Sequence, residues 1–358
     1  MLCRNGGMMP NARIRLAATP IIISICALLG GCALHGVPAT ISKLDLAPAA
    51  AITAACLGRD GRVWFAISRN GPGPAIGYID NSGDVEITQL DPVSYGHYIG
   101  GLAVDAEHGV WATMPCSRFV PGCTGPGYAR FGGDYGPLTK IHPLGSAGAM
   151  PNGVALMADG SVWIADWRAN AVVHVTPDDK EIAVTLTDRE FKPVGAEADG
   201  NGGAYFDGPE AGKIVAVDRR GRIRTYVLPT RTSHTSSAVP GLNGTMWDAE
   251  YDADKIVAFD RKGATTEYSV PTPNAGPATV VVDIAGAVWF IERDGQKIGR
   301  IDTDGTVEDA YLPLDVGTPA FLVAAPNDTL VVIGFTKGIF NTSLTWALAR
   351  ISESTPLK

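Results

Sequence analysis

Short apolar runs alternate with polar turns along most of this chain, and the alternation returns at a nearly fixed spacing. Each run centres on a tryptophan, tyrosine or valine. The step from Trp163 to the next centre recurs unchanged up to the last one, and the two earlier steps are somewhat longer. Fixed-period similarity of this kind is typical of a repeat architecture. The seven centres are Trp64, Trp111, Trp163, Tyr205, Trp247, Trp289 and Val331.

Each repeat reads as four short extended segments separated by turns. A turn precedes the centre, as in RDGRVW and IAGAVW, and in four units another turn follows the third segment, as after KIVAVD and KIGRID. A last extended segment closes near a proline, as in TYVLP and EYSVP. Such a unit has sheet faces that it cannot bury alone. The pattern predicts an all-β fold, a seven-bladed β-propeller of four-stranded blades.

The last repeat lacks a fourth extended segment, because it ends with WALARIS at residues 346–352. The segment ISKLDLAP, residues 41–48, precedes the first repeat and has the pattern of an outer strand. We expect it to join the last blade, which would close the ring and remove a free sheet edge. The alternative is an array that stays open. The propeller would then span 41–352 and leave 353–358 as a C-terminal tail.

The repeated tryptophans and Asp-Gly pairs are interpreted as architecture. Large aromatic residues at one register of every repeat are expected to pack between neighbouring blades. Aspartate and glycine favour turns because of their backbone preferences and side-chain hydrogen bonding. Neither feature is a catalytic signal.

A candidate site lies where the second strand of each blade ends and the first begins, since these positions share one mouth of the central channel. Several polar residues fall at these registers, and their types can perform acid–base chemistry or hold a cation. A solvated rim whose charges pair locally is the alternative interpretation. The polar residues at these registers are Tyr98, Asn152, Asp166, Lys192, His234, Ser236, Glu250 and Glu292.

Two insertions are expected at the same mouth. The third strand begins much later after the centre in the units of Trp111 and Val331 than it does in the unit of Trp289. In both units the extra residues fall after the second strand. Long loops on one face of a rigid scaffold are where binding sites are usually found.

The cysteines divide into a loop pair and a single residue in the repeat region. The insertion after Trp111 contains Cys116 and Cys123, which predict a local disulfide in an exported protein. Cys56 lies in the apolar run AITAACL without a partner. We expect it to be a buried, inert thiol.

The N-terminal segment resembles an export signal. Its positive charge comes from arginines without any acid, and the apolar stretch 21–31 is too short to span a bilayer. The run Leu29-Gly30-Gly31-Cys32 resembles the lipobox of bacterial lipoproteins. Residues 1–31 are therefore expected to be a signal peptide, with Cys32 lipidated and 32–40 a tether. A plain signal peptide with a chance cysteine is the alternative.

Composition limits the partners. Removing residues 1–31 leaves 26 basic and 37 acidic residues, a net charge of −11, which disfavours nucleic acid. Membrane attachment would come from the lipid rather than from a basic face. Ala33 after the cysteine resembles an outer-membrane address, so we expect a cell-envelope protein that faces the periplasm. The protein is expected to be a monomer.

The stretch GPATVVVDIAGAVWFIERDGQKIGRIDTDGTVEDAYLP, residues 276–313, closely resembles repeats of the virginiamycin B lyase family. The resemblance covers 41–352 in period and is sharp in the third to sixth blades. It implies a seven-bladed propeller that linearises streptogramin B antibiotics by magnesium-assisted elimination at the ester.

The chemistry implied by the family is not matched residue by residue. The family's last blade carries Pro-His-Gly with a glutamate two residues before the histidine, and a metal-binding glutamate follows the aromatic residue. The preceding blade has a second Pro-His. Here the last blade reads Thr318-Pro319-Ala320 and then VVIGF, and the preceding blade has Pro277-Ala278. No catalytic residue or metal ligand is therefore carried over, and no cofactor is expected unless lyase activity persists with magnesium.

The leading hypothesis is an envelope lipoprotein whose propeller binds a small molecule or protein at the mouth that bears the insertions. One alternative is a hydrolase or lyase that uses His234 with Glu250 or Lys192. Another is a true magnesium-dependent streptogramin B lyase. A six-bladed lactonase-type relative is disfavoured because seven registers can be counted.

Overall fold

The computed structural model describes most of the repeat region as β-strands. The described residues are 13–16, 39–46, 51–68, 74–90, 98–106, 109–115, 125–131, 138–145, 149–208, 212–231, 233–235, 238–312, 317–326, 329–337 and 342–350. Two single turns of 3₁₀ helix occur within these ranges, η2 (Leu242–Gly244) and η3 (Tyr251–Ala253). No helix in them is long and apolar enough to cross a membrane.

The strands form separate antiparallel sheets in chain order, each running from an innermost to an outermost strand. The first contains β3 (Ala51–Leu57), β4 (Val63–Ser68), β5 (Ala75–Ile79) and β6 (Val85–Gln89), with β1 (Arg13–Leu16) added outside β6. The next contains β7 (Gly101–Val104), β8 (Val110–Met114), β9 (Gly127–Phe131) and β10 (Leu138–Pro143). It is followed by β11 (Pro151–Leu156), β12 (Val162–Asp166), β13 (Ala171–Val175) and β14 (Glu181–Thr185).

The remaining sheets continue the same order. One contains β15 (Glu197–Ala198), β16 (Ala204–Asp207), β17 (Lys213–Val217) and β18 (Ile223–Val227). Another contains β19 (Val239–Pro240), β20 (Met246–Glu250), β21 (Lys255–Phe259) and β22 (Thr265–Ser269). Then come β23 (Pro277–Val282), β24 (Val288–Glu292), β25 (Lys297–Ile301) and β26 (Val307–Tyr311). The last contains β27 (Thr318–Ala325), β28 (Thr329–Lys337), β29 (Thr342–Arg350) and β2 (Ala39–Leu46).

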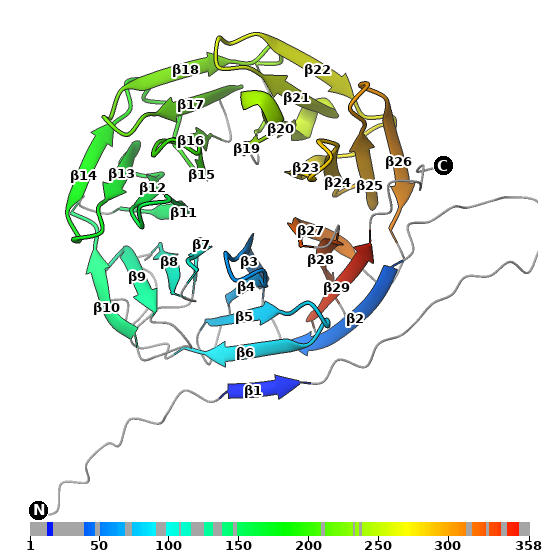
Figure 1. The fold of residues 1–358 in the computed structure, drawn as a ribbon, viewed down its shortest axis with the longest axis horizontal. Coiled ribbons are helices and arrows are strands. Elements are labelled where there is room, and N and C mark those ends of the chain that lie inside the picture. The colour runs from blue at the N-terminus through cyan, green and yellow to red at the C-terminus, as the bar shows by residue number, and fades with distance from the viewer. Residues whose placement is uncertain are drawn as a thin grey trace, which may run out of the picture.

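The sheets stand around a common centre like the blades of a propeller (Figure 1). Each innermost strand contacts the innermost strand of the next sheet, and β27 contacts β3. The predicted all-β propeller with four-stranded blades is confirmed. Six sheets have four strands, and the sheet of β3–β6 has five.

The fifth strand of that sheet differs from the sequence prediction. β1 lies within the segment expected to be a signal peptide outside the fold, and it pairs antiparallel with β6 from Arg13↔Thr88 to Leu16↔Val85. An outermost strand presents unpaired backbone groups, so any extended segment within reach can add to it.

β2 comes from the N-terminal side of the repeats and pairs along its whole length with β29, from Ala39↔Ala349 to Leu46↔Thr342. It therefore occupies the outer position of a sheet whose other three strands come from the C-terminal end. Residues 351–358, which include the predicted tail, lie outside the described part of the chain.

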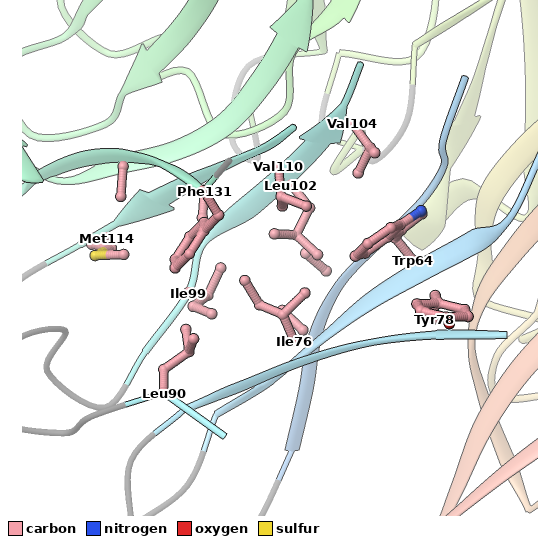
Figure 2. Packing of buried hydrophobic residues seen from close by; sticks show 14 residues of the cluster. Trp64, Ile76, Tyr78, Leu90, Ile99, Leu102, Val104, Val110, Met114 and Phe131 are labelled. Carbon is pink, nitrogen blue, oxygen red and sulfur yellow. The ribbon is translucent and has the colours of Figure 1, made fainter. Parts of the chain in front are cut away.

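Buried apolar side chains are gathered between neighbouring sheets rather than in one central core. One cluster joins Trp64 and Ile76 of the first sheet to Leu102 and Phe131 of the second (Figure 2). A comparable cluster joins Val331 of the last sheet to the first. Side chains of successive sheets interdigitate, so each blade is stabilised by both neighbours.

The tryptophan registers supply much of this packing, as the sequence predicted. Trp64, Trp111, Trp163 and Trp289 are buried, whereas Trp247 is half-buried. The Asp-Gly pairs form turns: Asp304 accepts a hydrogen bond from the backbone N–H of Thr306 (2.9 Å), and Gly305 has a positive φ of 88°. The structural interpretation of both features therefore holds.

Each sheet has two opposite edges, here called the mouth edge and the turn edge. The mouth edge is where second strands end and third strands begin, for example at Glu250 and Lys255. The turn edge is the opposite one, where third strands end, for example at Val217 and Phe259.

Candidate functional site

Acidic residues end the second strand in four successive sheets at the mouth edge. Asp166 ends β12, Asp207 ends β16, Glu250 ends β20 and Glu292 ends β24, and all four are buried. Three of them stand at the register that the sequence indicated. The sequence reading missed Asp207, because that register gives Gly208 in its unit. The signal was present as an acid that directly closes the apolar run AYF.

Asp166 and Asp207 accept hydrogen bonds from backbone N–H groups of nearby loop residues. The Oδ1 atom of Asp166 accepts hydrogen bonds from the N–H groups of Met150 (2.9 Å) and Ala169 (3.2 Å). Asp207 accepts one from the N–H of Gly195, and burial raises the pKa of Asp207 to about 6. A Cβ on Gly195 would collide with this carboxylate, so glycine is required there. Both acids therefore fix the start of an inner strand.

Glu250 and Glu292 lie in two polar sets that repeat from one sheet to the next. Glu250 pairs in register with Lys255, whose ammonium binds Glu267 and lies 3.2 Å from Thr230 Oγ1. The equivalent set around Glu292 consists of Lys297, Asp309 and Thr272, in which Lys297 Nζ is 2.8 Å from Asp309 and 2.7 Å from Thr272 Oγ1. In each set the lysine already has an acidic partner.

The two buried glutamates are consequently held in their neutral form more readily than ordinary glutamates. Both side chains are 0% exposed, and none of their four carboxyl oxygens has a hydrogen-bond partner. Burial, followed by the negative charge of Glu267, raises the pKa of Glu250 to about 7. Burial and then Asp309 raise the pKa of Glu292 to about 7 as well. Each glutamate pairs in register with the lysine of its own sheet, and within the described residues the two do not belong to a common group that could hold a metal ion.

These pKa values predict a stability that falls as the pH rises. A carboxyl whose folded-state pKa is raised gives its full contribution below its unfolded-state pKa and loses it as the pH passes the folded-state pKa. Between pH 5 and pH 8 the free energy of unfolding should drop by about 1–3 kcal/mol through these two groups. Urea unfolding of a Glu250→Gln/Glu292→Gln variant should show a flatter pH dependence. The exposed Glu190→Gln change is the control, and an unchanged slope in the double variant would contradict the assignment.

Lys192 has positive φ, 49°, and is placed by the loop before β15. Its N–H donates to Asn170 Oδ1 (2.8 Å), and its ammonium lies 5.3 Å from the centre of the Trp167 ring. The ammonium therefore has a cation–π contact at the mouth edge. It has no carboxylate partner among the described residues.

His234 is exposed and belongs to a different group of contacts. Its Nδ1 atom lies within hydrogen-bonding distance of Asp252 Oδ2, and its backbone N–H donates to the same oxygen at 3.2 Å. Next to it, the Tyr251 hydroxyl donates to Asp294 Oδ2 (2.6 Å) of the following sheet. The described contacts do not join His234 to Lys192 or to the Glu250 carboxyl.

The remaining predicted residues are only partly described. Tyr98 is 44% exposed before β7, and Asn152 is half-buried, with its carbonyl oxygen accepting a hydrogen bond from the Thr113 hydroxyl. Cys56 is a free, half-buried thiol whose pKa is raised to about 12 by burial first and then by the charges of Glu197 and Asp60. Outside the described residues lie Cys32, Cys116, Cys123 and Ser236.

The positions implied by the family resemblance lie at the mouth end of β27 and β28. Thr318 stands directly opposite Phe335, and Pro319 opposite Gly334. Ala320 falls at a register shift, and its carbonyl oxygen accepts a hydrogen bond from Thr279 Oγ1 of the preceding sheet (3.4 Å). The backbone thus brings these positions together.

Residues 210–339 match the model of the virginiamycin B lyase family. This matched stretch is similar to the virginiamycin B lyase family. A virginiamycin B lyase from Nocardia farcinica (strain IFM 10152) is 34% identical over 97 residues, which is 27% of this chain and 34% of that protein. The match thus spans about a third of the length of this curated relative.

Solved structures of virginiamycin B lyases share the fold. The selenomethionine-substituted enzyme from Staphylococcus aureus has a TM-score of 0.72 at 19% identity, covering 87% of this chain and 99% of that one. A catalytically inactive form of the enzyme from the same organism, with quinupristin, has a TM-score of 0.71 at 20% identity, covering 85% and 98%. A structure described as streptogramin B lyase gives 0.71 at 19% identity, covering 85% and 96%. At these identities the likeness concerns the fold alone.

Proposed function

We propose that this protein is an envelope lipoprotein that has kept the family's propeller and binds a small molecule at the mouth edge without catalysing the lyase reaction. One observation carries the proposal. The three positions that the resemblance gives to the base and the metal ligands meet at the end of β27 and β28, and they are Ala320, Thr318 and Phe335.

These residues do not fit a magnesium ion. Mg²⁺ is held in proteins by carboxylates and other oxygen ligands in near-octahedral geometry. Thr318 offers a single hydroxyl, Phe335 offers no donor and Ala320 offers no side-chain base. Within the described residues, no three His, Cys, Asp or Glu side chains are grouped so that they could hold a metal ion. The proposed function therefore does not involve magnesium.

The scaffold that we propose is a closed ring of seven blades, in which β2 completes the last one. Three observations support it. β2 pairs with β29 along its whole length, β27 contacts β3, and an apolar cluster joins the last sheet to the first. Closure would hold the mouth residues of different blades at fixed separations.

The anchor that we propose is a lipid on Cys32, which follows the lipobox-like run Leu29-Gly30-Gly31. The protein would then be attached to the outer membrane and face the periplasm. The predicted Cys116–Cys123 disulfide would order one insertion at the mouth edge.

The mouth edge offers a mixed surface for a ligand that has both rings and polar groups. Tyr98 presents an exposed aromatic ring, Lys192 presents an ammonium beside Trp167, and His234 presents an imidazole beside Asp252. Aromatic faces with a few convergent polar groups are typical of small-molecule sites.

Quinupristin is the first probe, because a structure of a catalytically inactive relative holds it. Saturating quinupristin should raise the unfolding temperature of the full-length protein, and calorimetry should give a saturable isotherm. A Lys192→Ala/His234→Ala variant should lose at least tenfold in affinity, whereas Lys180→Ala on the turn edge should not. No binding by the wild type, or equal binding by both variants, would overturn a quinupristin-type ligand at this edge.

A further inference from the structure

Six exposed cations gather on two neighbouring outer turns of the turn edge. The turns connect β17 to β18 and β21 to β22 in adjacent sheets. The Arg224 Nη2 atom donates to the carbonyl oxygen of Lys262 (2.8 Å), which places the two turns side by side. These cations, here called the basic patch, are Arg219, Arg220, Arg222, Arg224, Arg261 and Lys262.

Most of the patch charge is not neutralised within the described residues. Arg222 forms an ion pair with Asp218 at 2.6 Å, and Arg224 lies over the Tyr226 ring. The Asp260 carboxylate is occupied by the backbone N–H groups of its own turn. The other four cations, Arg219, Arg220, Arg261 and Lys262, have no carboxylate partner there.

The patch is an exception on this edge rather than part of the repeat. An aspartate directly follows the third strand in these turns as in others, but the next positions differ: Asp304 follows β25 where the patch turns have Arg220 and Lys262, and Asp84 follows β5 where Arg222 stands in the first patch turn. The chain as a whole is negative as well, with a formal net charge of −8. A local excess of positive charge in such a protein indicates an anionic partner.

The N-terminal tether leaves the propeller at this same edge. β2 begins at Ala39, opposite Ala349 near the end of β29. β29 is a third strand, and third strands end at the turn edge. The short segment 32–38 alone connects the lipobox-like run to β2, and it reaches at most about 25 Å when fully extended. A lipid on Cys32 would therefore hold the turn edge close to the membrane.

We propose that the basic patch binds the anionic headgroups of the membrane to which the protein is anchored, so that the mouth edge points away from the lipid. The orientation rests on the proposed lipid anchor, whereas the patch does not. A hollow of about 450 Å³ beside the patch is lined by Asn243, Gly244, Asp260, Arg261 and Lys262, so two cations and one carboxylate face it.

The acidic turns on the same edge restrict the contact with the membrane to the two sheets that carry the basic patch. Asp84 and Asp304 have no acidic counterpart in the patch turns and repel an anionic surface, so the sheets of β15–β18 and β19–β22 approach the lipid first. The propeller would therefore lie tilted, with its patch side toward the membrane. Each Lys or Arg near an anionic surface adds to binding, and the attraction weakens within a Debye length.

The experiment uses the mature protein, residues 32–358, carrying Cys32→Ala, so that neither the lipid nor the apolar stretch 21–31 contributes to binding to vesicles. Co-sedimentation is measured with vesicles of phosphatidylglycerol and phosphatidylcholine, and with phosphatidylcholine alone, at low and high salt. The test variant is Arg219→Gln/Arg220→Gln/Lys262→Gln. The matched control removes three exposed arginines of the mouth edge, Arg168→Gln/Arg189→Gln/Arg293→Gln.

We expect the Cys32→Ala protein to bind the anionic vesicles, to release them at high salt and to ignore neutral vesicles. The patch variant should lose at least about tenfold in partitioning, and the control should not. Equal binding by the patch variant would overturn the proposal. No binding of the Cys32→Ala protein to anionic vesicles would overturn it as well, and would indicate that the patch binds an anionic macromolecule in solution. Fractionation of Cys32→Ala cells after a high-salt wash, which should release protein held only by the patch, tests the anchor separately. Retention in the membrane fraction as for the wild type would exclude Cys32 as the anchor and leave the patch untouched.

Discussion

Full-length protein incubated with Mg²⁺ and quinupristin should yield no linear product. The elimination needs a base beside the reacting carbon and a cation that polarises the ester carbonyl. Ala320 stands at the position that the family resemblance gives to the base and has no titratable group, and Phe335 stands at a position that it gives to a metal ligand. Loss of general-base catalysis alone costs about 10²–10⁴ in rate, and the missing metal ligands add to this. Mass spectrometry of the antibiotic after incubation measures the outcome.

The Staphylococcus aureus enzyme, assayed under the same conditions, is the positive control for this experiment. Turnover by the present protein would contradict the prediction. If that turnover disappeared in a His234→Ala variant, the active site would lie at the His234–Asp252 pair of another blade. Because Glu250 and Glu292 are buried against their own lysines, a substitution of either should affect stability before activity.

The second large effect is expected for Trp163→Ala, which should lower the free energy of unfolding by about 3–5 kcal/mol. The Trp163 side chain is 1% exposed, stacks on His174 at 4.6 Å between ring centres, and meets Phe206 of the next sheet edge-on at 6.3 Å. Its Nε1 atom donates to the carbonyl oxygen of Gly202, also in the next sheet (3.2 Å). The substitution thus removes contacts on both sides of a blade interface.

Trp247→Ala is the matched control for this substitution. Trp247 occupies the same register, but its side chain is half-buried and lies beside Tyr268 of its own sheet. Its loss should cost distinctly less. Urea unfolding followed by circular dichroism compares the two variants, and an equal loss would mean that interface packing does not set the stability of this propeller.

The repeat pattern was sufficient to predict the strands and their order. Alternating apolar residues specify which face of a strand is buried, and turn residues mark where it ends. The acids Asp166, Glu250 and Glu292 could therefore be placed at strand ends from spacing alone, and the structure has them there. The same arithmetic failed for Asp207, because β16 ends one position before the register predicts.

Side-chain partnerships could not be predicted, because they depend on which of several nearby groups a flexible side chain reaches. Nothing in the spacing shows that Lys192 lies over Trp167, or that His234 pairs with Asp252 and not with Glu250. The set of Thr230, Lys255 and Glu267 was also missed, although an equivalent set stands one repeat later in the chain. A search for repeated polar residues, and not only apolar ones, would have found both sets.

The apolar cluster that joins the last sheet to the first has a consequence for how such a chain can evolve. In an open array, a duplicated or deleted repeat alters one end and leaves the other interfaces intact. In the closed ring that we propose, every sheet has a neighbour on each side, so one repeat more or fewer would change the angle at every interface. New specificity is then more accessible by exchange of residues at the mouth edge, where side chains can change without disturbing the circumference.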